Sequence, residues 1–383
     1  MTNINSDFLI VGAGVSGATV ARILAENNFK VTVVEKRPNI AGNTFDYYDN
    51  NGILVQKYGP HIFHTNEKLV FDFLSRFTDW FSYKHKVLAL VDGTLVPVPF
   101  NLTSLETLFD SDTAKSIKEI LINEFGYGQK LPILKLIDHE NQAVRDFAKF
   151  VYEKIFKFYT QKQWGLKPED MDGLVTARVP VYISYEDNYF TDEYQFQPKN
   201  GFTSLIENML NHDNITVKLS VDALKFISID DEQILLDGKP FNGQVVYTGQ
   251  LDELFNYKFG KLPYRSLEFD FKTLPVSSYQ KSAVINYTTS ENYTRISEFT
   301  KFTCPKKDNT VIVYEYSKNC EENDIPYYPV LTENGKNAYI RYARLAKNIK
   351  NLHLLGRLAD YKYYNIDSAV LNALKLAQNL CKG

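Results

Sequence analysis

This sequence of 383 residues has few cysteines, little net charge and no long hydrophobic run, and each shortage argues against a class of protein. Its three cysteines, Cys304, Cys320 and Cys381, are odd in number and without paired spacing, which argues against a disulfide framework and a zinc site. A formal net charge of -3 provides no field to attract polyanions, so nucleic acid is not an expected partner. The polar segment Met1–Asp7 and the short apolar run Phe8–Val11 do not fit a secretion signal or a membrane span. We therefore expect a cytoplasmic protein without membrane insertion.

The first 35 residues follow the order strand, glycine turn, helix, strand. Phe8–Val11 is a continuous apolar run that ends at Gly12, and apolar residues recur at mostly helical spacing over Ser16–Glu26. A second apolar run, Val31–Val34, ends at Glu35. This order predicts a βαβ unit, and hence an α/β fold with a doubly wound parallel sheet.

The pattern changes after about residue 80. Val87–Val91 and Thr94–Val98 flank Asp92-Gly93, which predicts a β-hairpin, and residues 105 to 164 read mainly as helices. Strand-like runs return later, at 179–185, 215–219, 245–248, 282–287, 311–316 and 352–356, before a helix over 368–380. We expect a helical bundle and an antiparallel sheet inserted into the parallel-sheet domain. The expected segments are 1–80, 201–255 and 336–383 for the dinucleotide-binding domain, 81–103, 166–200 and 256–335 for the antiparallel sheet domain, and 104–165 for the helical domain with a mobile substrate loop.

The glycine turn matches the pattern G-x-G-x-x-G of dinucleotide-binding folds. Gly12 allows a tight turn, Gly14 allows the backbone to approach a pyrophosphate, and Gly17 allows close packing of helix on strand. The turn follows a strand and opens a helix, and Glu35 ends the next strand, where a carboxylate can accept both ribose hydroxyls. This context favours nucleotide binding over a merely structural glycine turn.

Two further segments distinguish FAD from NAD. Glu35-Lys36-Arg37, followed by Ile40-Ala41-Gly42-Asn43, resembles the second signature of the large FAD family that includes amine oxidases. Leu354-Leu355-Gly356-Arg357 is similar to the strand and turn by which that family closes over the flavin diphosphate. The resemblance implies FAD as the cofactor.

A series of motifs over most of the chain resembles bacterial UDP-galactopyranose mutases. They are Tyr58–Thr65 (YGPHIFHT), Tyr159–Gly165 (YTQKQWG), the segments around Arg178 and Arg295, Asp187–Phe190, Glu321–Pro329 and Gly356–Tyr363. The resemblance implies an FAD-binding isomerase that interconverts UDP-galactopyranose and UDP-galactofuranose for cell-surface polysaccharide synthesis. It implies a reduced flavin whose N5 atom bonds to the sugar transiently, with no net electron transfer, and a homodimer as the assembly.

The resemblance also implies a set of site residues. Catalytic roles fall to Arg178, Arg295 and His61. Substrate contacts fall to Asn101, Phe156, Tyr159, Trp164, Arg178, Tyr189, Arg295, Tyr328, Tyr363 and Asn365. Cofactor contacts fall to Gly12, Gly14, Ser16, Gly17, Glu35, Lys36, Arg37, Gly42, Asn43, His61, Ile62, Gly356, Arg357, Tyr363, Asn365 and Ile366.

Elementary chemistry supports some of these roles and leaves others open. Forked guanidinium groups match phosphate oxygens, so Arg178 and Arg295 suit a nucleotide diphosphate, although a surface ion pair is the alternative. Tyr159 has helical spacing from buried-type residues and so fits core packing as well as a nucleotide base. Trp164 follows a polar stretch and precedes glycine, which favours a loop. His61 and His64 lack a third ligand nearby in sequence, so no metal site is expected, and His64 is expected to be structural.

One position departs from the family pattern. Members typically carry aspartate two residues beyond the tyrosine that matches Tyr363, and this chain has Asn365 there. The departure leaves other nucleotide sugars open, among them UDP-N-acetylgalactosamine and dTDP-fucose or a related deoxy sugar. An amine-oxidase-type FAD oxidoreductase and a catalytically silent nucleotide-sugar binding protein are further alternatives.

Overall fold

The computed structural model describes residues 4–165, 180–230, 232–303 and 305–382. The chain divides into two compact units, each built from separate stretches of sequence. Unit 1 holds residues 1–82, 192–264 and 324–383, and unit 2 holds residues 83–191 and 265–323. The seven-segment division stays a prediction. In the described part of the chain, no helix combines the length and apolar character that crossing a membrane requires.

Unit 1 is built around a five-stranded parallel sheet with the strand order β12-β2-β1-β16-β22. The strands are β1 (Phe8–Val11), β2 (Val31–Glu35), β12 (Ile215–Leu219), β16 (Gln244–Tyr247) and β22 (Leu352–Leu354). The central strand β1 is paired in parallel with both β2 and β16. The βαβ unit and the doubly wound parallel sheet predicted from the sequence are therefore confirmed.

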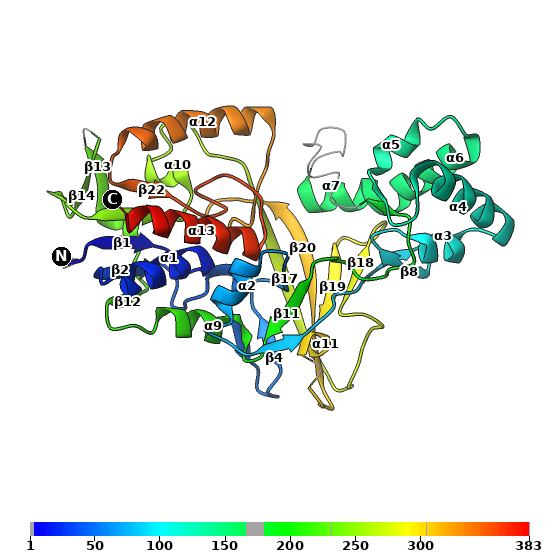
Figure 1. The fold of residues 1–383 in the computed structure, drawn as a ribbon, viewed down its shortest axis with the longest axis horizontal. Coiled ribbons are helices and arrows are strands. Elements are labelled where there is room, and N and C mark those ends of the chain that lie inside the picture. Colours follow the sequence, from blue (N-terminus) through cyan, green and yellow to red (C-terminus); the bar gives the residue numbers. More distant parts are fainter. Residues whose placement is uncertain (1–3, 166–179, 231, 304, 383) are drawn as a thin grey trace. The chain divides into compact units, whose positions relative to one another are not determined.

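Helices and small sheets complete unit 1. Helix α1 (Val15–Glu26) packs against α13 (Ile366–Leu380) and α9 (Gly201–Leu210), and Figure 1 shows the red α13 beside the blue α1. The buried faces of these helices and of the sheet form one hydrophobic core. The other elements are α2 (Lys68–Leu74), α10 (Leu251–Leu254), α12 (Glu333–Asn348), η1 (Gly42–Thr44), η4 (Ala223–Lys225), β3 (Asp46–Tyr48), β4 (Leu54–Gln56), β5 (Phe63–Thr65), β6 (Trp80–Ser82), β11 (Tyr194–Pro198), β13 (Ile227–Asp230), β14 (Gln233–Leu236), β15 (Lys239–Pro240) and β21 (Tyr328–Pro329).

Unit 2 combines a largely antiparallel sheet with a group of helices. The strands of the sheet that lie in unit 2 follow the order β17-β20-β19-β18-β7-β8, in which β18 pairs with β7 in parallel. Its strands are β7 (Val87–Val91), β8 (Thr94–Val98), β17 (Tyr264–Leu274), β18 (Val284–Tyr287), β19 (Arg295–Glu298) and β20 (Thr310–Asn319). The predicted hairpin is confirmed with the same bounds, and Asp92 and Gly93 at its turn both have positive φ.

The predicted helices after residue 104 are present in unit 2. They are α3 (Leu102–Leu108), α4 (Ser111–Phe125), α5 (Ile133–Ile137), α6 (Gln142–Val151), the π-helix η2 (Tyr152–Lys157) and α7 (Phe158–Trp164), and the short α11 (Thr300–Thr303) follows later. The strand predicted over 179–185 is shorter: Val181–Tyr182 form β10, which pairs with β9 (Lys130–Leu131). Trp164 is the last residue of helix α7, so the prediction that it lies on a loop is wrong. Gly165 then ends the helix with φ +68.

Candidate functional site

The glycine turn in unit 1 has the geometry that its spacing predicts. Gly12 has φ +107, and a Cβ atom there would lie 2.1 Å from Thr248 Oγ1. A Cβ atom on Gly17 would lie 2.0 Å from the backbone oxygen of Gly12, so helix α1 packs this closely only with glycine. Gly14 faces Gly42, whose own φ is +54. Backbone from two separate turns therefore meets here without side chains between them.

Glu35 ends β2 and fastens the turn to the sheet. Its Oε2 atom accepts a hydrogen bond from the Ala13 N–H at 3.0 Å, and its Oε1 atom accepts one from the Arg37 N–H at 2.9 Å. The side chain is buried, and each oxygen keeps a second lone pair for a further donor. The ribose contact expected of Glu35 stays a prediction.

A cavity of about 330 Å³ lies at the carboxyl ends of β1, β2 and β16, the position where nucleotides bind in open parallel sheets. Fourteen of the predicted cofactor residues line it: Gly12, Gly14, Ser16, Gly17, Glu35, Lys36, Arg37, Gly42, Asn43, His61, Gly356, Arg357, Asn365 and Ile366. Ile62 and Tyr363 are not among the lining residues. Sequence reasoning missed Val221, Asp222, Thr248, Gln250, Glu253 and Tyr364, which also line the cavity.

Arg37 offers an unsatisfied donor in the wall of this cavity. Its guanidinium lies 4.6 Å from the centre of the Tyr58 ring, and its Nη2 atom donates to Asn43 Oδ1 at 2.9 Å. The Nη1 atom is buried and has no hydrogen-bond partner within the described residues. A buried guanidinium edge without a partner is costly in the free protein and suits a phosphate oxygen.

A second arginine of the cavity wall, Arg357, is held between aromatic rings and backbone carbonyls. Its guanidinium lies 4.8 Å from the centre of the Tyr363 ring and 5.6 Å from that of Tyr328. It donates to the backbone oxygens of Tyr327 at 3.3 Å and Tyr364 at 2.7 Å. Tyr363 thus contributes to the cavity indirectly, by stacking on Arg357.

His61 is a neutral imidazole at ordinary pH. Burial, and then the nearby positive charge of Arg357, lower the pKa of His61 to about 4. Its Nδ1 atom lies 2.9 Å from the backbone oxygen of Gly59. Because a carbonyl only accepts, Nδ1 carries the proton and Nε2 presents a lone pair. The backbone oxygen of His61 accepts from both Gln56 and Gln197, which fixes this loop.

The contacts of His64 lead to the cavity, and the structural role expected of it stays a prediction. Its Nδ1 atom lies 3.0 Å from Asp192 Oδ2, and its Nε2 atom lies 3.3 Å from the side-chain nitrogen of Asn365. Asn365 lines the cavity and precedes α13 as its N-cap residue.

Arg295, on β19 of unit 2, is held by a buried carboxylate. Its Nε atom lies 3.1 Å from Glu315 Oε1 on β20, with side-chain exposures of 23% and 4%. Its Nη2 atom donates to Gln163 Oε1 on α7 at 3.3 Å. This ion pair is not the exposed surface pair considered as the alternative, because Glu315 is almost fully buried.

The end of helix α7 is fastened to the same sheet. Arg265 donates to the backbone oxygens of Gln163 at 3.2 Å and Lys162 at 3.1 Å. The Lys162 ammonium group donates to the backbone oxygens of Tyr287, Glu291 and Tyr293, and burial lowers its pKa. These contacts fix the helix that carries Tyr159 and Trp164 against the sheet that contains Arg295.

The remaining predicted substrate residues of unit 2 have mixed environments. Phe156 is buried within η2, while Tyr159 and Trp164 are half-buried. Tyr189 is half-buried and its ring packs edge-on against His85.

Asn101 is buried, and both its side-chain oxygen and its side-chain nitrogen are hydrogen-bonded. Asn101 is 1% exposed and caps helix α3, where its Oδ1 atom accepts from the Ser104 N–H at 3.0 Å. Its Nδ2 atom donates to the Glu186 backbone oxygen and to Asp187 Oδ1. A contact between the sugar and Asn101 would require breaking these bonds, so the structure favours a structural role. Arg178 lies outside the described residues.

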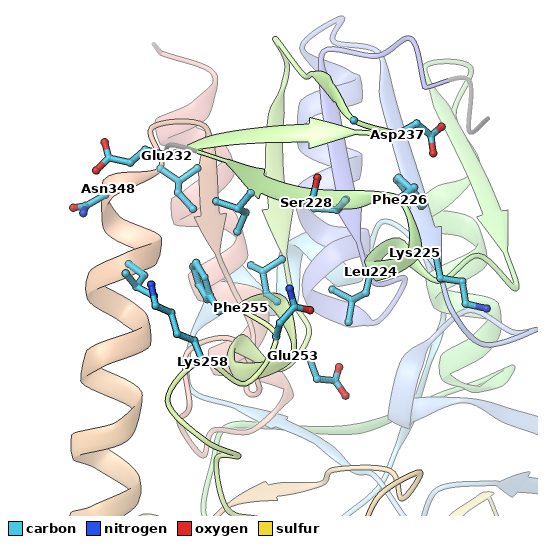
Figure 2. A pocket seen from close by; sticks show the side chains of 17 residues that line it. Leu224, Lys225, Phe226, Ser228, Glu232, Asp237, Glu253, Phe255, Lys258 and Asn348 are labelled. Carbon is cyan, nitrogen blue, oxygen red and sulfur yellow. The ribbon is translucent and has the colours of Figure 1, made fainter.

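A second cavity, of about 750 Å³, lies elsewhere in unit 1 beside the β13–β14 hairpin, α10 and α12. Figure 2 shows charged side chains of both signs, among them Lys225, Asp237 and Lys258, spread around it without converging on one point. It shares Leu224 and Glu253 with the smaller cavity. The glycine turn and the unsatisfied Arg37 belong to the smaller cavity, which is therefore the candidate site. Among the described residues, no three His, Cys, Asp or Glu side chains are grouped to hold a metal ion.

Comparison with known proteins agrees with the resemblance to UDP-galactopyranose mutases that the sequence motifs indicate. The family model described as UDP-galactopyranose mutase matches residues 154–363, and one described as an NAD(P)-binding Rossmann-like domain matches residues 10–77. A UDP-galactopyranose mutase of Mycoplasma genitalium is 36% identical over 388 residues, covering 99% of this chain and 96% of that protein. A dTDP-fucopyranose mutase of Escherichia coli is 34% identical over 373 residues, covering 97% of each.

The solved structures agree on the fold. A crystal structure of reduced UDP-galactopyranose mutase superposes with a TM-score of 0.75 at 15% identity, covering 98% of this chain and 94% of that one. The fold predicted from the sequence, a Rossmann-like parallel sheet with an antiparallel sheet domain, is confirmed. The sequence identities over nearly the full length show that the chain belongs to the UDP-galactopyranose mutase family and is an isomerase of that nucleotide-sugar mutase family.

Proposed function

We propose that this chain binds FAD in the 330 Å³ cavity of unit 1 and uses it in the reduced form. Support comes from the turn at Gly12 and Gly17, where no side chain can be accommodated, and from the buried unpaired Nη1 atom of Arg37. The turn brings backbone N–H groups at the start of α1 towards a pyrophosphate, and Arg37 adds a forked cation. Bound FAD, when reduced, supplies the nucleophile for the anomeric carbon of the sugar.

We infer that the reaction interconverts the pyranose and furanose forms of UDP-galactose. The observation that carries this inference is the identity of 36% to a UDP-galactopyranose mutase across nearly the whole of both chains. The chemistry of the residues supports it. Release and recapture of a diphosphate at the anomeric carbon requires cations that match developing negative charge.

The roles of individual residues follow from that requirement. Arg295, oriented by Glu315 and Gln163, binds the diphosphate and stabilises it as it leaves the sugar. We assign the same role to Arg178. The hydroxyl groups of Tyr189, Tyr328 and Tyr363 donate to phosphate oxygens.

Other predicted residues bind the nucleotide and the cofactor. Phe156, Tyr159 and Trp164 provide aromatic surface for the base. His61, neutral and with Nε2 free to accept, receives a hydrogen bond from the cofactor or the sugar.

A second substrate is favoured by two specific observations. The E. coli dTDP-fucopyranose mutase matches nearly as well, at 34% identity, and Asn365 occupies the position where the family pattern has aspartate. Replacing a carboxylate by an amide removes a charge and adds a donor, which changes the hydroxyl pattern that the position can bind. A dTDP-linked deoxy sugar is therefore the second candidate.

One substrate panel tests both candidates. Purified protein, reduced with dithionite under nitrogen, is incubated with UDP-galactofuranose, dTDP-fucofuranose and the furanose form of UDP-N-acetylgalactosamine, and products are separated by anion-exchange chromatography. We expect conversion of UDP-galactofuranose to the pyranose without consumption of reductant, and none with oxidised protein. Faster conversion of the dTDP sugar would favour the second candidate. Absence of conversion of any sugar with fully reduced flavin would contradict the mutase proposal.

The arginine assignment has its own variants. R178A and R295A should each abolish turnover while the flavin absorbance spectrum stays unchanged, because both residues act on the diphosphate. R76K is a matched control, since Arg76 contacts Glu26 at an exposed position of unit 1. Near-normal turnover by R178A or R295A would contradict that residue's role.

A further inference from the structure

Asp192, His64 and Asn365 are linked within unit 1 by a series of side-chain contacts that ends at the candidate cofactor cavity. His64 lies on β5 and faces Gln195 of the paired strand β11, and its side chain is 10% exposed. Asp192 contacts one ring nitrogen at 3.0 Å and Asn365 contacts the other at 3.3 Å. Of the three residues, only Asn365 lines the cavity.

Asp192, the first residue of this series of contacts, fixes the tautomer of His64. A carboxylate only accepts hydrogen bonds, so the proton of a neutral imidazole must be on Nδ1, where it faces Asp192. Asp192 is itself held in place, because its Oδ1 atom accepts from Asn66 at 3.1 Å and its backbone oxygen accepts from Gln195 at 2.9 Å. The Nε2 atom of His64 is then an acceptor.

The tautomer in turn fixes the side-chain amide of Asn365. An accepting Nε2 must face the amide nitrogen Nδ2, so the amide oxygen Oδ1 turns the other way. Asparagine at the N-cap of a helix ordinarily turns its oxygen to a backbone N–H of the first turn. The side chain of Asn365 makes no such bond in α13, and it contacts His64 instead.

We propose that Asp192 and His64 are positioning residues that orient Asn365 so that its oxygen Oδ1 faces the cavity as a neutral hydrogen-bond acceptor. The group that it accepts from is a hydroxyl or N–H of the bound cofactor or nucleotide sugar. Where the sugar is concerned, the inference rests on the proposed function. The specificity at Asn365 is therefore set partly by two residues that do not line the cavity.

Two substitutions of His64 separate its two contacts. The longer side chain of glutamine reaches the place of Nε2, so H64Q keeps an acceptor for Asn365. Asparagine reaches only the place of Nδ1, so H64N keeps a donor for Asp192 and leaves the Asn365 amide without its partner. E193Q is the matched control, because Glu193 is next to Asp192 in sequence and its backbone, not its side chain, contacts Asn66.

The first measurement has two parts, and its thermodynamic part, the FAD titration, needs no mutase activity. The affinity of the apoprotein for FAD is measured by titration for the wild type, H64Q, H64N, N365A and the double variants H64Q/N365A and H64N/N365A. For the same proteins, KM and kcat are measured with the preferred sugar. We expect H64N to weaken FAD or sugar binding about tenfold, the size of one lost hydrogen bond, and H64Q to stay within about threefold of the wild type. In the N365A background H64Q and H64N should be equal, since the contact they affect is gone. Equal effects in the wild-type background, or a difference that persists with N365A, would contradict the proposal.

The second measurement reads the tautomer directly. The protein has six histidines, so selective ¹⁵N-histidine labelling of the FAD-loaded protein gives few signals, and H64Q identifies that of His64 by its loss. We expect a proton on Nδ1 and none on Nε2. In N365D the Nε2 atom faces a carboxylate, which only accepts hydrogen bonds, so we expect its signal to differ from that of the wild type. An Nε2-protonated wild type, or an unchanged ring in N365D, would overturn the chain of contacts.

These readouts separate the two proposals. If no nucleotide sugar is converted, the proposed function fails, while the NMR signals and the FAD titration still test the role of His64. If sugars are converted but H64Q and H64N behave alike, the inference fails and the proposed function stands. Should H64N not fold, the wild-type and N365D spectra still give the tautomer.

Discussion

The two units position their candidate site residues by different means. In unit 1 the candidate cofactor cavity is shaped mainly by backbone: a Cβ atom does not fit at Gly12 or Gly17, and Gly42 has φ +54 with Gly14 Cα 3.1 Å from where its Cβ atom would lie. In unit 2 the predicted substrate residue Arg295 is a side chain whose direction is set by buried polar partners, Glu315 and Gln163. Where backbone shapes a site, substitution of one of a few glycines should greatly reduce binding. Where side chains shape it, substitution of any one residue should reduce binding by a smaller amount. Mutations at the cavity of unit 1 and at the predicted substrate residues of unit 2 should therefore differ in how strongly they reduce ligand binding.

The largest effect is expected at the glycine turn. G12A puts a methyl group 2.1 Å from Thr248 Oγ1 at a φ of +107, so the turn must distort, and we expect FAD affinity to fall about a hundredfold or more. G93A is the matched control, because Gly93 has φ +84 with nothing within 4 Å of the added Cβ atom. FAD content after gel filtration measures both variants. Normal FAD content in G12A would break the comparison, since it would show that the backbone does not decide cofactor binding.

The next largest loss of FAD affinity is expected at Arg37, because there a side chain, and not the backbone, would contact the cofactor. R37M removes the unpaired Nη1 donor and should weaken FAD binding about thirtyfold, the value of a charge-assisted hydrogen bond of about 2 kcal/mol. Fluorescence titration of the apoprotein with FAD measures this loss. Affinity for the nucleotide sugar, measured on FAD-saturated protein, should change little; an equal loss of both affinities would argue against a cofactor role.

A smaller effect is expected from the ion pair of unit 2. E315Q leaves the guanidinium of Arg295 beside a neutral amide, and we expect a loss of about 1–3 kcal/mol in unfolding free energy together with a raised KM. The FAD spectrum should not change. D270N serves as the control, because Asp270 and Lys272 form an exposed pair that contributes less than about 1 kcal/mol. An E315Q variant with normal KM would show that Arg295 needs no buried partner.

The smallest effect concerns the pH dependence of stability. The pKa of His61 is about 4 in the folded protein and ordinarily 6.5, so between these values the unfolded chain binds a proton that the folded one does not. Stability attributable to His61 is therefore present above pH 6.5 and is lost as the pH falls towards 4. Urea unfolding at pH 6.5 and 5.0 should show a loss about 1 kcal/mol greater in the wild type than in H61Q.

The comparison of wild type and H61Q isolates His61 from other buried groups. Burial raises the pKa of Asp46, Asp252 and Glu253, which makes contributions of the opposite sign. These contributions are common to both proteins and cancel in the difference. Parallel curves for the two proteins would show that His61 is not the group responsible.

The sequence predicted those features that depend on local patterns. The glycine turn, the βαβ unit and the hairpin at Asp92-Gly93 were predictable because each needs particular residues at fixed spacing. Strand β17 was not predicted, although Leu267, Phe269 and Phe271 alternate with charged residues, the pattern of a half-buried strand. Its first half is buried and contains Arg265 and Ser266, which hides the alternation.

The candidate site was predictable at the level of residue types but not of partners. Arg37 was predicted to contact the cofactor and Arg295 a nucleotide diphosphate, and the structure adds that Arg37 has an unpaired donor and Arg295 a buried carboxylate partner. Asn101 was expected to contact the sugar, yet its amide caps a helix and contacts Asp187. Such partners come from residues far apart in the chain, as Asp192 does for His64, so no local pattern predicts them.

The order of strands in the parallel sheet has a consequence for how the protein is made. Strand β1, near the first residues, pairs with β16 around residue 245, and β16 pairs with β22 around residue 352. During synthesis the ribosome releases β1 and β2 long before their sheet can be completed, because strand β22 (Leu352–Leu354) and helix α13 (Ile366–Leu380) follow them much later in the sequence. Pairing over such distances along the chain slows folding, since a long loop must close before the contact forms. The apolar strands β1 and β2 therefore stay without part of their sheet for most of the synthesis of residues 1–354.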